Sequence, residues 1–325
     1  MDFKPWEQQW DTVIIGGGPG GVAAAIYGIR GELKTLLIEK SFIGGQIALT
    51  AEVENYPGVP NTTGMQLAQN MDEQLRKFNA QIINKTVERL HEAPGSGYLV
   101  ELNSGEMVET KTVVIATGSR PNLLEAKNAK EFYGHGVSYC AICDGPFFRG
   151  QDVIIVGGGD AAMEEAQYLA SVCGHVTLVH RREGFRAQPI AVNRTKAVPN
   201  ITMRLNTIIT EVMGADGKVS GVRIRDTKTD AEDVIPAAAV FVFIGSIPNS
   251  QFARGFVTMS DDGQIFVDNR MRTSRPGIFA VGDITHKSLK QMSVSVGEGA
   301  SAAIMARHYI TTGEWPEEPP SPVHD

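Results

Sequence analysis

The 325-residue sequence predicts an α/β protein in which one structural unit occurs twice. Residues 12–21 and 153–162 share one pattern, an apolar strand followed by a glycine-rich turn and the start of a helix. A second phrase, Gly-Ser-x-Pro-Asn, occurs at residues 118–122 and again at 245–249, each time after an apolar strand. Strands that run through a glycine turn into a helix are typical of nucleotide-binding folds. The duplication therefore predicts two Rossmann-like (three-layer ββα) dinucleotide-binding domains, the second inserted into the first.

The other strands follow in the same order in both units. After the glycine turn and its helix come an apolar strand, an alternating strand with turn signals and a closing strand. These segments are 33–38, 98–102 and 113–116 in the first unit, and 176–179, 219–224 and 240–244 in the second.

The last part of the chain has no third glycine turn. It carries a strand signal at 277–283 and a helix of small residues at 293–310, which we expect to complete the first domain. The predicted domains are therefore residues 1–119 with 247–325, and an inserted domain of residues 120–246. Two short connections join them and form a candidate hinge.

Charge and composition exclude several classes of function. The net charge of −7 predicts no nucleic-acid partner. The longest strongly apolar stretch, residues 237–247, is too short to span a membrane, which needs roughly 18 residues. Because residues 1–11 contain no apolar signal core, we expect a cytoplasmic protein without a membrane anchor.

The glycines suit a dinucleotide pyrophosphate, which must approach the free N–H groups of a helix N-terminus closely. The first turn reads G-x-G-x-x-G, and the second reads G-x-G-x-x-A. The residues concerned are Gly16, Gly18 and Gly21 in the first turn, and Gly157, Gly159 and Ala162 in the second.

The residue at the end of the following strand distinguishes the two nucleotides. In the first unit it is Glu39, whose carboxylate accepts hydrogen bonds from ribose hydroxyls and repels a 2′-phosphate, so this unit suits FAD or NAD. In the second unit His180 stands there, followed by Arg181, Arg182 and Arg186. Guanidinium groups match phosphate oxygens, so this unit favours NADPH, although a solvated charge run would look the same.

Cys140 and Cys143 form a C-x-x-C pair inside the inserted domain. A zinc site is a poor interpretation, because structural zinc takes four ligands and only Cys173 remains among the cysteines; we expect no metal. The pair suits a dithiol that cycles with a disulfide, with an incidental pair as the alternative. Cys173, at the end of a predicted helix, is expected to be a buried core thiol.

With these motifs together, the sequence resembles the low-molecular-weight NADPH-dependent thioredoxin reductases, which are FAD-containing pyridine nucleotide-disulfide oxidoreductases. The resemblance covers residues 11 to 310. Its landmarks are residues 16–21, 44–46, 54–58, 116–118, 140–145, 157–165, 180–187 and 277–283.

The resemblance implies FAD in the first domain and NADPH in the second. The residues it assigns to FAD are Gly16, Gly18, Pro19, Gly20, Gly21, Glu39, Gly45, Gln46, Asn55, Thr117, Gly118, Gly282, Asp283, Gln291 and Met292. Those it assigns to NADPH are Gly157, Gly159, Asp160, Ala161, Ala162, His180, Arg181, Arg182 and Arg186.

The resemblance also implies the catalytic roles. Cys143 would face the flavin, Cys140 would exchange with a thioredoxin disulfide, and Asp144 would be the acid-base group, unless it is only a turn residue. Because the nicotinamide and the cysteine pair share one domain, the resemblance implies domain rotation between half-reactions. It further implies a homodimer, and thioredoxin contacts by Phe147 and Phe148, which are otherwise core residues.

Two places depart from the family pattern. Residues 290–292 read Lys-Gln-Met where the family more often has Arg-Gln-Ala, and the tail 314–325 is acidic and rich in proline. Trp315 and His324 in this tail are candidates to stack on a flavin. The alternatives to a thioredoxin reductase are a flavin disulfide reductase with another acceptor protein or with ferredoxin as donor, and an NADP(H) redox sensor without turnover.

Overall fold

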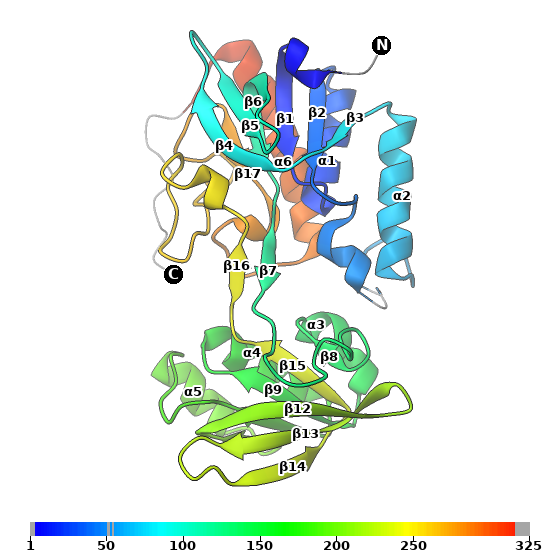
Figure 1. Cartoon of the computed structure of the whole chain (residues 1–325), viewed down its shortest axis with the longest axis vertical. Coiled ribbons are helices and arrows are strands. Elements are labelled where there is room, and N and C mark those ends of the chain that lie inside the picture. Colours follow the sequence, from blue (N-terminus) through cyan, green and yellow to red (C-terminus); the bar gives the residue numbers. More distant parts are fainter. Residues whose placement is uncertain (1–3, 51–52, 54, 316–325) are drawn as a thin grey trace. The chain divides into compact units, whose positions relative to one another are not determined.

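The computed structural model describes residues 4–50, 53 and 55–315 (Figure 1). The described chain divides into two compact units. The first unit holds the described residues of 1–50, 56–120 and 247–325, and the second holds those of 51–55 and 121–246. His324 and Glu54, which the sequence singled out, lie outside the described residues.

A seven-stranded sheet forms the centre of the first unit, in the order β3-β2-β1-β6-β5-β4 with β17 also paired to β6. Its parallel strands are β1 (Trp10–Ile15), β2 (Thr35–Glu39), β3 (Gln81–Asn84), β6 (Met107–Ile115) and β17 (Ile278–Ala280). Its antiparallel strands are β4 (Val87–Glu92) and β5 (Tyr98–Leu102).

The strand β6 is longer than the predicted segment 113–116 because it serves two ladders. Its first half pairs antiparallel with β5, and its second half continues parallel beside β1 and β17. β17 is shorter than the predicted strand 277–283, because the chain turns at Gly282, whose φ is +76°, into a 3-10 turn at Gly282–Ile284.

Three helices belong to the first unit: α1 (Pro19–Arg30), α2 (Gly64–Lys77) and α6 (Met292–Thr312). The last helix crosses α1 so closely that a Cβ at Gly299 would lie 2.0 Å from the carbonyl oxygen of Gly20. Small residues at this crossing therefore let the two backbones touch, and the start of α6 is held next to the first glycine turn.

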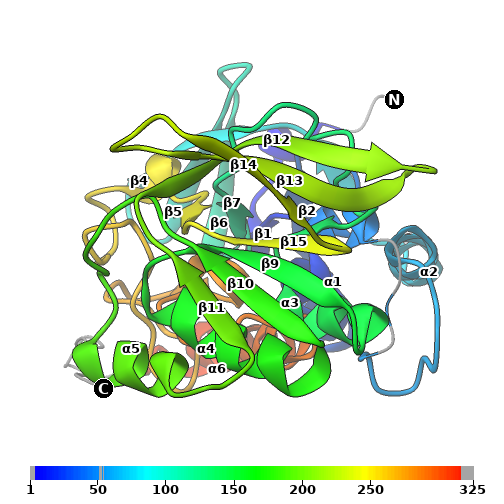
Figure 2. The same ribbon diagram turned by 90° about the horizontal axis from the view of Figure 1, so that it is seen from below.

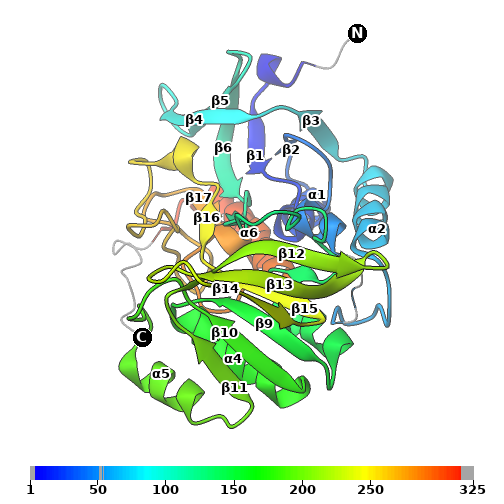
Figure 3. The same cartoon turned by 60° about the horizontal axis from the view of Figure 1, so that its bottom comes forward.

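The second unit has three layers. Its parallel sheet has the order β11-β10-β9-β15-β8, with strands β8 (Val137–Ser138), β9 (Asp152–Gly157), β10 (His175–Val179), β11 (Ile201–Arg204) and β15 (Ala239–Phe243). An antiparallel sheet lies on one face, with strands β12 (Thr207–Ala215), β13 (Lys218–Asp226) and β14 (Glu232–Pro236). Helices α4 (Asp160–Val172) and α5 (Pro189–Lys196) cover the other face, as Figure 2 and Figure 3 show. The predicted fold class, two Rossmann-like domains of ββα type, is confirmed.

The two Gly-Ser-x-Pro-Asn phrases form a two-stranded ribbon. β7 (Ser119–Pro121) pairs with β16 (Ser246–Pro248), and the two strands run side by side in Figure 1. The chain passes between the two units at these connections.

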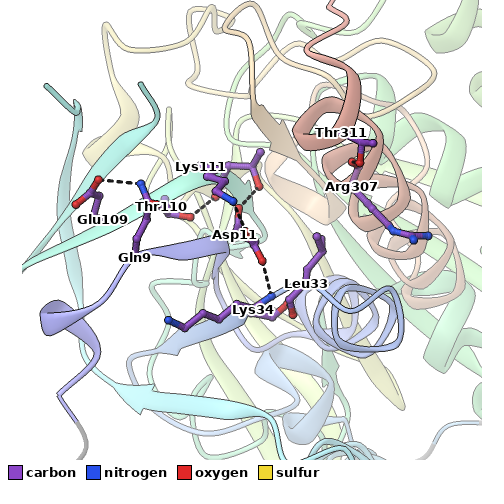
Figure 4. A network of polar contacts seen from close by, with 11 residues as sticks. Gln9, Asp11, Leu33, Lys34, Glu109, Thr110, Lys111, Arg307 and Thr311 are labelled. Carbon is purple, nitrogen blue, oxygen red and sulfur yellow. Dashed lines mark hydrogen bonds and ion pairs between the residues drawn. The ribbon is translucent and has the colours of Figure 1, made fainter. Parts of the chain in front are cut away.

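A polar network ties strands together at the amino end of the first sheet (Figure 4). One carboxylate oxygen of Asp11 accepts from the backbone N–H of Lys34 at 2.9 Å, and the other accepts from the Lys111 ammonium at 2.7 Å. The glycine turns lie at the opposite, carboxyl ends of the strands, so this network serves the fold and leaves the binding edge free. No helix of the described residues is long and apolar enough to cross a membrane.

Candidate active site

The glycines of the first turn are required by close backbone contacts. A Cβ at Gly16, where φ is +107°, would lie 2.4 Å from the carbonyl oxygen of Ala116. A Cβ at Gly21 would lie 1.8 Å from the carbonyl oxygen of Gly16. In the second unit, a Cβ at Gly157 would likewise lie 2.5 Å from the carbonyl oxygen of Phe243. Strand, turn and helix therefore pack without room for side chains.

The middle glycines, in contrast, face open space. A Cβ built at Gly18 or at Gly159 meets no atom within 4 Å. Each is the N-cap of its helix, α1 or α4, and neither provides a side-chain cap for the helical N–H groups. Open space beside uncapped N–H donors is the environment that a pyrophosphate needs, so both turns fit a dinucleotide.

The predicted ribose ligand Glu39 is held in place at the first turn. Its carboxylate accepts from the N–H of Gly17 at 2.7 Å and from the N–H of Ser41 at 2.8 Å. Gly45 packs against this turn, because its Cβ position lies 3.2 Å from Cα of Gly18. Both residues therefore lie around the space in front of α1.

Asp283 lies in the 3-10 turn that follows β17. Burial raises the pKa of its carboxyl, against the effect of Lys287 and Lys290, which lowers it. Glu298, a residue that the sequence did not single out, fixes this turn by accepting from the N–H of Gly282 at 2.7 Å and from the Lys287 ammonium at 2.7 Å. Only the folded structure brings these residues together, because Glu298 lies on α6.

The other predicted FAD residues take different positions. The Thr117 hydroxyl donates to the carbonyl of Asn249 at 2.8 Å. Gln46 is an exposed residue of the 3-10 turn Gly45–Leu49. Gln291 is the N-cap of α6, and Met292 is its first residue. Asn55 belongs to the segment 51–55, which groups with the second unit.

At the second turn the loop after β10 folds back onto the glycines. The N–H groups of Arg186 and Ala187 both donate to the carbonyl of Gly158, at 2.8 and 3.1 Å. The His180 ring packs over Gly158, stacks on Phe185 with centroids 4.9 Å apart, and bonds through Nε2 to the Gly184 carbonyl at 3.0 Å. Since Nε2 faces a carbonyl acceptor, it is the nitrogen that donates, and the ring of His180 contacts both the loop and the glycine turn.

The arginines of this loop are available to a ligand. The side chains of Arg181, Arg182 and Arg186 are exposed and form no ion pair with any described carboxylate. Asp160, at the start of α4, accepts instead from the N–H of Gln188 at 2.8 Å, which also holds the loop against the turn. The loop therefore presents three cations beside the second glycine turn.

The C-x-x-C pair is a disulfide. Cys140 and Cys143 are joined with a Cα–Cα distance of 5.3 Å, at the short helix α3 (Ala141–Asp144). The N–H of Cys143 donates to Sγ of Cys140 at 3.2 Å, a contact that stabilises a thiolate once the bond is reduced. Ile142 between them is exposed.

Asp144 is a largely buried carboxyl in the residue after this disulfide. Burial raises the pKa of the Asp144 carboxyl, and a hydrogen bond from the Ser138 hydroxyl, at 2.5 Å, lowers it in part. A carboxyl with a raised pKa is suited to donate a proton to a leaving thiolate. Ser138 is a second site residue that the sequence did not reveal.

Glu165, on α4, is a third residue to which the sequence assigned no role. Burial raises the pKa of its carboxyl to about 7, and one of its oxygens is buried without a hydrogen-bond partner among the described residues. A buried oxygen without a partner needs an explanation, and a bound ligand is one. The sequence signal was its position one turn into the helix that follows the second glycine turn.

Three further residues that the sequence singled out have defined surroundings. Cys173 is buried, and burial raises the pKa of its thiol to about 11, so it is the expected core thiol. The ring of Phe148 packs edge-on against Phe241 in the core, with centroids 5.9 Å apart. Trp315 packs within the first unit against Phe279 and Tyr309.

With this geometry described, comparison with known proteins gives the class. The family Pyridine nucleotide-disulphide oxidoreductase matches residues 10–299. The chain belongs to this family, whose members use flavin and nicotinamide nucleotides.

The names of individual similar proteins give more detail than the family does. A thioredoxin reductase of Peptoclostridium acidaminophilum is 40% identical over 94% of this chain and 98% of its own length. An alkyl hydroperoxide reductase protein from Pseudomonas putida is 36% identical over 94% of this chain, but only 59% of that protein is matched. The crystal structure of thioredoxin reductase from Streptococcus pyogenes is 40% identical over 94% of this chain and 99% of that chain, with a TM-score of 0.89.

Proposed function

We propose that this protein reduces thioredoxin with electrons from NADPH, through FAD and the Cys140–Cys143 pair. The observation that carries the proposal is the disulfide itself. It lies beside a buried carboxyl, in the same unit as a glycine turn flanked by three free arginines. Relatives that match nearly end to end are thioredoxin reductases, which favours this acceptor over others.

FAD would be held by the first unit. The uncapped N–H groups of α1 would bind its pyrophosphate, and the fixed carboxylate of Glu39 would bind a ribose. Asp283 and the start of α6, near Gln291, would hold the ribityl chain and the ring. When bound there, FAD supplies the two-electron chemistry between a nicotinamide and a disulfide.

NADPH would be held by the second unit. Its pyrophosphate would bind at the N-terminus of α4 in front of Gly159, and Arg181, Arg182 and Arg186 would bind its 2′-phosphate. Because the Nε2 of His180 is bonded to Gly184, we assign the phosphate contacts to the arginines and the loop support to His180. The orphaned oxygen of Glu165 would accept from the nicotinamide carboxamide.

The thiol steps involve three residues. The Cys140 thiolate attacks the thioredoxin disulfide, an S–S bond forms between them, and the departing thioredoxin thiolate takes the Asp144 proton. The Cys143 thiol then gives its proton to Asp144, and its sulfur attacks Cys140. This restores the internal disulfide and releases the second thioredoxin thiolate, so two electrons pass to thioredoxin.

Both the disulfide and the NADPH turn belong to the second unit, so each must reach the flavin in turn. We therefore retain rotation about the ribbon of β7 and β16 as part of the proposal, together with a homodimer and a cytoplasmic location. The alkyl hydroperoxide reductase relative keeps another thioredoxin-like acceptor as the second candidate.

The test uses the yellow holoprotein under anaerobic conditions. NADPH should bleach the flavin absorbance and oxidised thioredoxin should restore it, whereas NADH at equal concentration should bleach far more slowly. Arg181→Gln should reduce the preference for NADPH, and Arg194→Gln, an exposed arginine on α5, is the matched control. Bleaching without recovery would favour another acceptor, and no bleaching by NADPH would contradict the proposal.

A further inference from the structure

Ser138 lies at the centre of the hydrogen bonds around the disulfide. It is the last residue of β8, it is 3% exposed, and its Cα is paired in register with Phe241 of β15. Its Oγ lies 2.5 Å from Oδ2 of Asp144, 3.1 Å from the backbone nitrogen of Cys140 and 3.2 Å from the carbonyl oxygen of Cys140. The hydroxyl thus links the carboxyl to the backbone of Cys140.

Its three contacts can be satisfied in two ways. A serine hydroxyl has one proton to donate and two lone pairs that accept. With Asp144 ionised, Ser138 donates to Oδ2 and accepts from the N–H of Cys140. With Asp144 protonated, the carboxyl donates to Oγ, and the serine proton turns to the carbonyl of Cys140. In both states every donor has an acceptor within hydrogen-bond distance.

Ser138 is the only hydrogen-bond partner among the causes that shift the pKa of Asp144. Tyr133 is the other titratable group that interacts with Asp144, and its ring packs edge-on against Tyr139 at 5.3 Å. On α4 and the 3-10 turn Gly145–Phe148, which pack against α3, and at their ends, the titratable and charged groups are Asp160, Glu164, Glu165, Tyr168, Cys173 and Arg149. None of them contributes to the shift of the Asp144 pKa. Burial and this one hydroxyl therefore set the pKa of the Asp144 carboxyl.

We propose that Ser138 is a positioning residue for the thiol–disulfide step, which holds the Asp144 carboxyl beside the Cys140–Cys143 pair in both of its protonation states. This inference rests on the proposed function, in which Asp144 gives and regains a proton. Cycling of that proton needs no rearrangement of the backbone, because only the serine hydroxyl turns. The strand register with β15 fixes where the hydroxyl stands.

Removing the hydroxyl has an effect of definite sign. In Ser138→Ala the ionised form of Asp144 loses a donor, so its pKa rises further. Hydrogen bonds to charged groups are strong enough that the shift should be about one pH unit. The inflection that Asp144 gives to the rate of thioredoxin reduction should therefore move about one unit toward higher pH.

The test measures single-turnover reduction of oxidised thioredoxin by NADPH-reduced holoprotein as a function of pH. Ser138→Ala should shift the inflection upward, Ser138→Thr should bring it back toward that of the wild type, and Asp144→Asn should remove it. Ser171→Ala, an exposed serine on α4 of the same unit, is the matched control. The rate of flavin reduction by NADPH is recorded for each variant to verify that the protein is folded and loaded.

The outcomes separate the two claims. An unshifted inflection in Ser138→Ala, with the inflection absent in Asp144→Asn, would overturn the role of Ser138 and leave the proposed function intact. An inflection that persists in Asp144→Asn would remove the acid-base role of Asp144 and with it this inference. If Ser138→Ala does not fold, Ser138→Cys, which has a weak donor in the same place, should show an upward shift, and its absence counts against the inference.

Discussion

Asn122 and Asn249 make the same pair of hydrogen bonds, each within its own unit. Asn122 donates from its backbone N–H to Gly245 at 3.0 Å and from its side chain to Ile244 at 3.2 Å. Asn249 donates to Gly118 at 3.0 Å and to Thr117 at 2.9 Å. The repeated phrase therefore fixes both ends of the ribbon of β7 and β16.

Replacing either asparagine should loosen an end of this ribbon. Asn249→Ala removes a donor from a partly buried carbonyl, which should cost about 1 kcal/mol of unfolding free energy. Chemical denaturation measures this cost, and Asn193→Ala on the exposed side of α5 serves as the control. Equal stability of the two variants would show that the ribbon ends are not held by these side chains.

Substitutions at two glycines of the first turn should affect folding and flavin binding separately. Gly16→Ala should fail to fold, because its Cβ would meet the backbone of Ala116, whereas Gly18→Ala should fold, because its Cβ enters open space. That space is where the pyrophosphate would lie, so Gly18→Ala should retain much less flavin. Absorbance of the purified proteins decides this, and a fully loaded Gly18→Ala would refute the assignment.

Lys287 and Glu298 form a largely buried ion pair, with side chains 16% and 13% exposed. Glu298→Gln leaves the ammonium without the carboxylate that it is bonded to, and we expect a loss of about 3 kcal/mol. The exposed pair of Lys228 and Glu183 offers the control, since Glu183→Gln should change stability far less than Glu298→Gln does. Similar losses in the two variants would argue against a special role of the turn at Asp283.

Glu165 should make stability depend on pH. Its pKa rises from 4.5 in the unfolded chain to about 7 in the fold, so the folded state binds more protons between these values. Stability therefore falls as pH rises through this window, by about 1 kcal/mol after allowance for solvent screening. Glu165→Gln should remove this dependence. Glu164→Gln takes away only the smaller of the two causes that raise the Glu165 pKa, so it should keep most of the dependence. Denaturation at several pH values tests both, and an unchanged slope in Glu165→Gln would contradict the assignment.

Most of the fold could be predicted from local signals. The strand β5 spans the predicted residues 98–102, and the last helix, Met292–Thr312, extends the predicted 293–310 by a few residues. Strong alternation and the duplicated glycine turns suffice for such elements. The strand 277–283 was predicted too long, because its end depends on the left-handed backbone of Gly282.

The residues of the site could be predicted only where they belong to a sequence motif. The disulfide pair and the arginine loop follow from spacing and charge, but Ser138, Glu298 and Glu165 do not. Ser138 matters because its hydroxyl meets a carboxyl six residues on, and Glu298 because α6 returns to the turn at Gly282. Such contacts arise from tertiary packing, which one sequence does not reveal.

The central claim is that the Cys140–Cys143 pair carries electrons from NADPH to thioredoxin. The most direct measurement is the steady-state rate of thioredoxin reduction by NADPH for the wild type, Cys140→Ser, Cys143→Ser and Cys173→Ser. The account predicts loss of turnover in the first two variants and wild-type turnover in Cys173→Ser, whose thiol is buried in the core. Undiminished turnover in Cys140→Ser would contradict it.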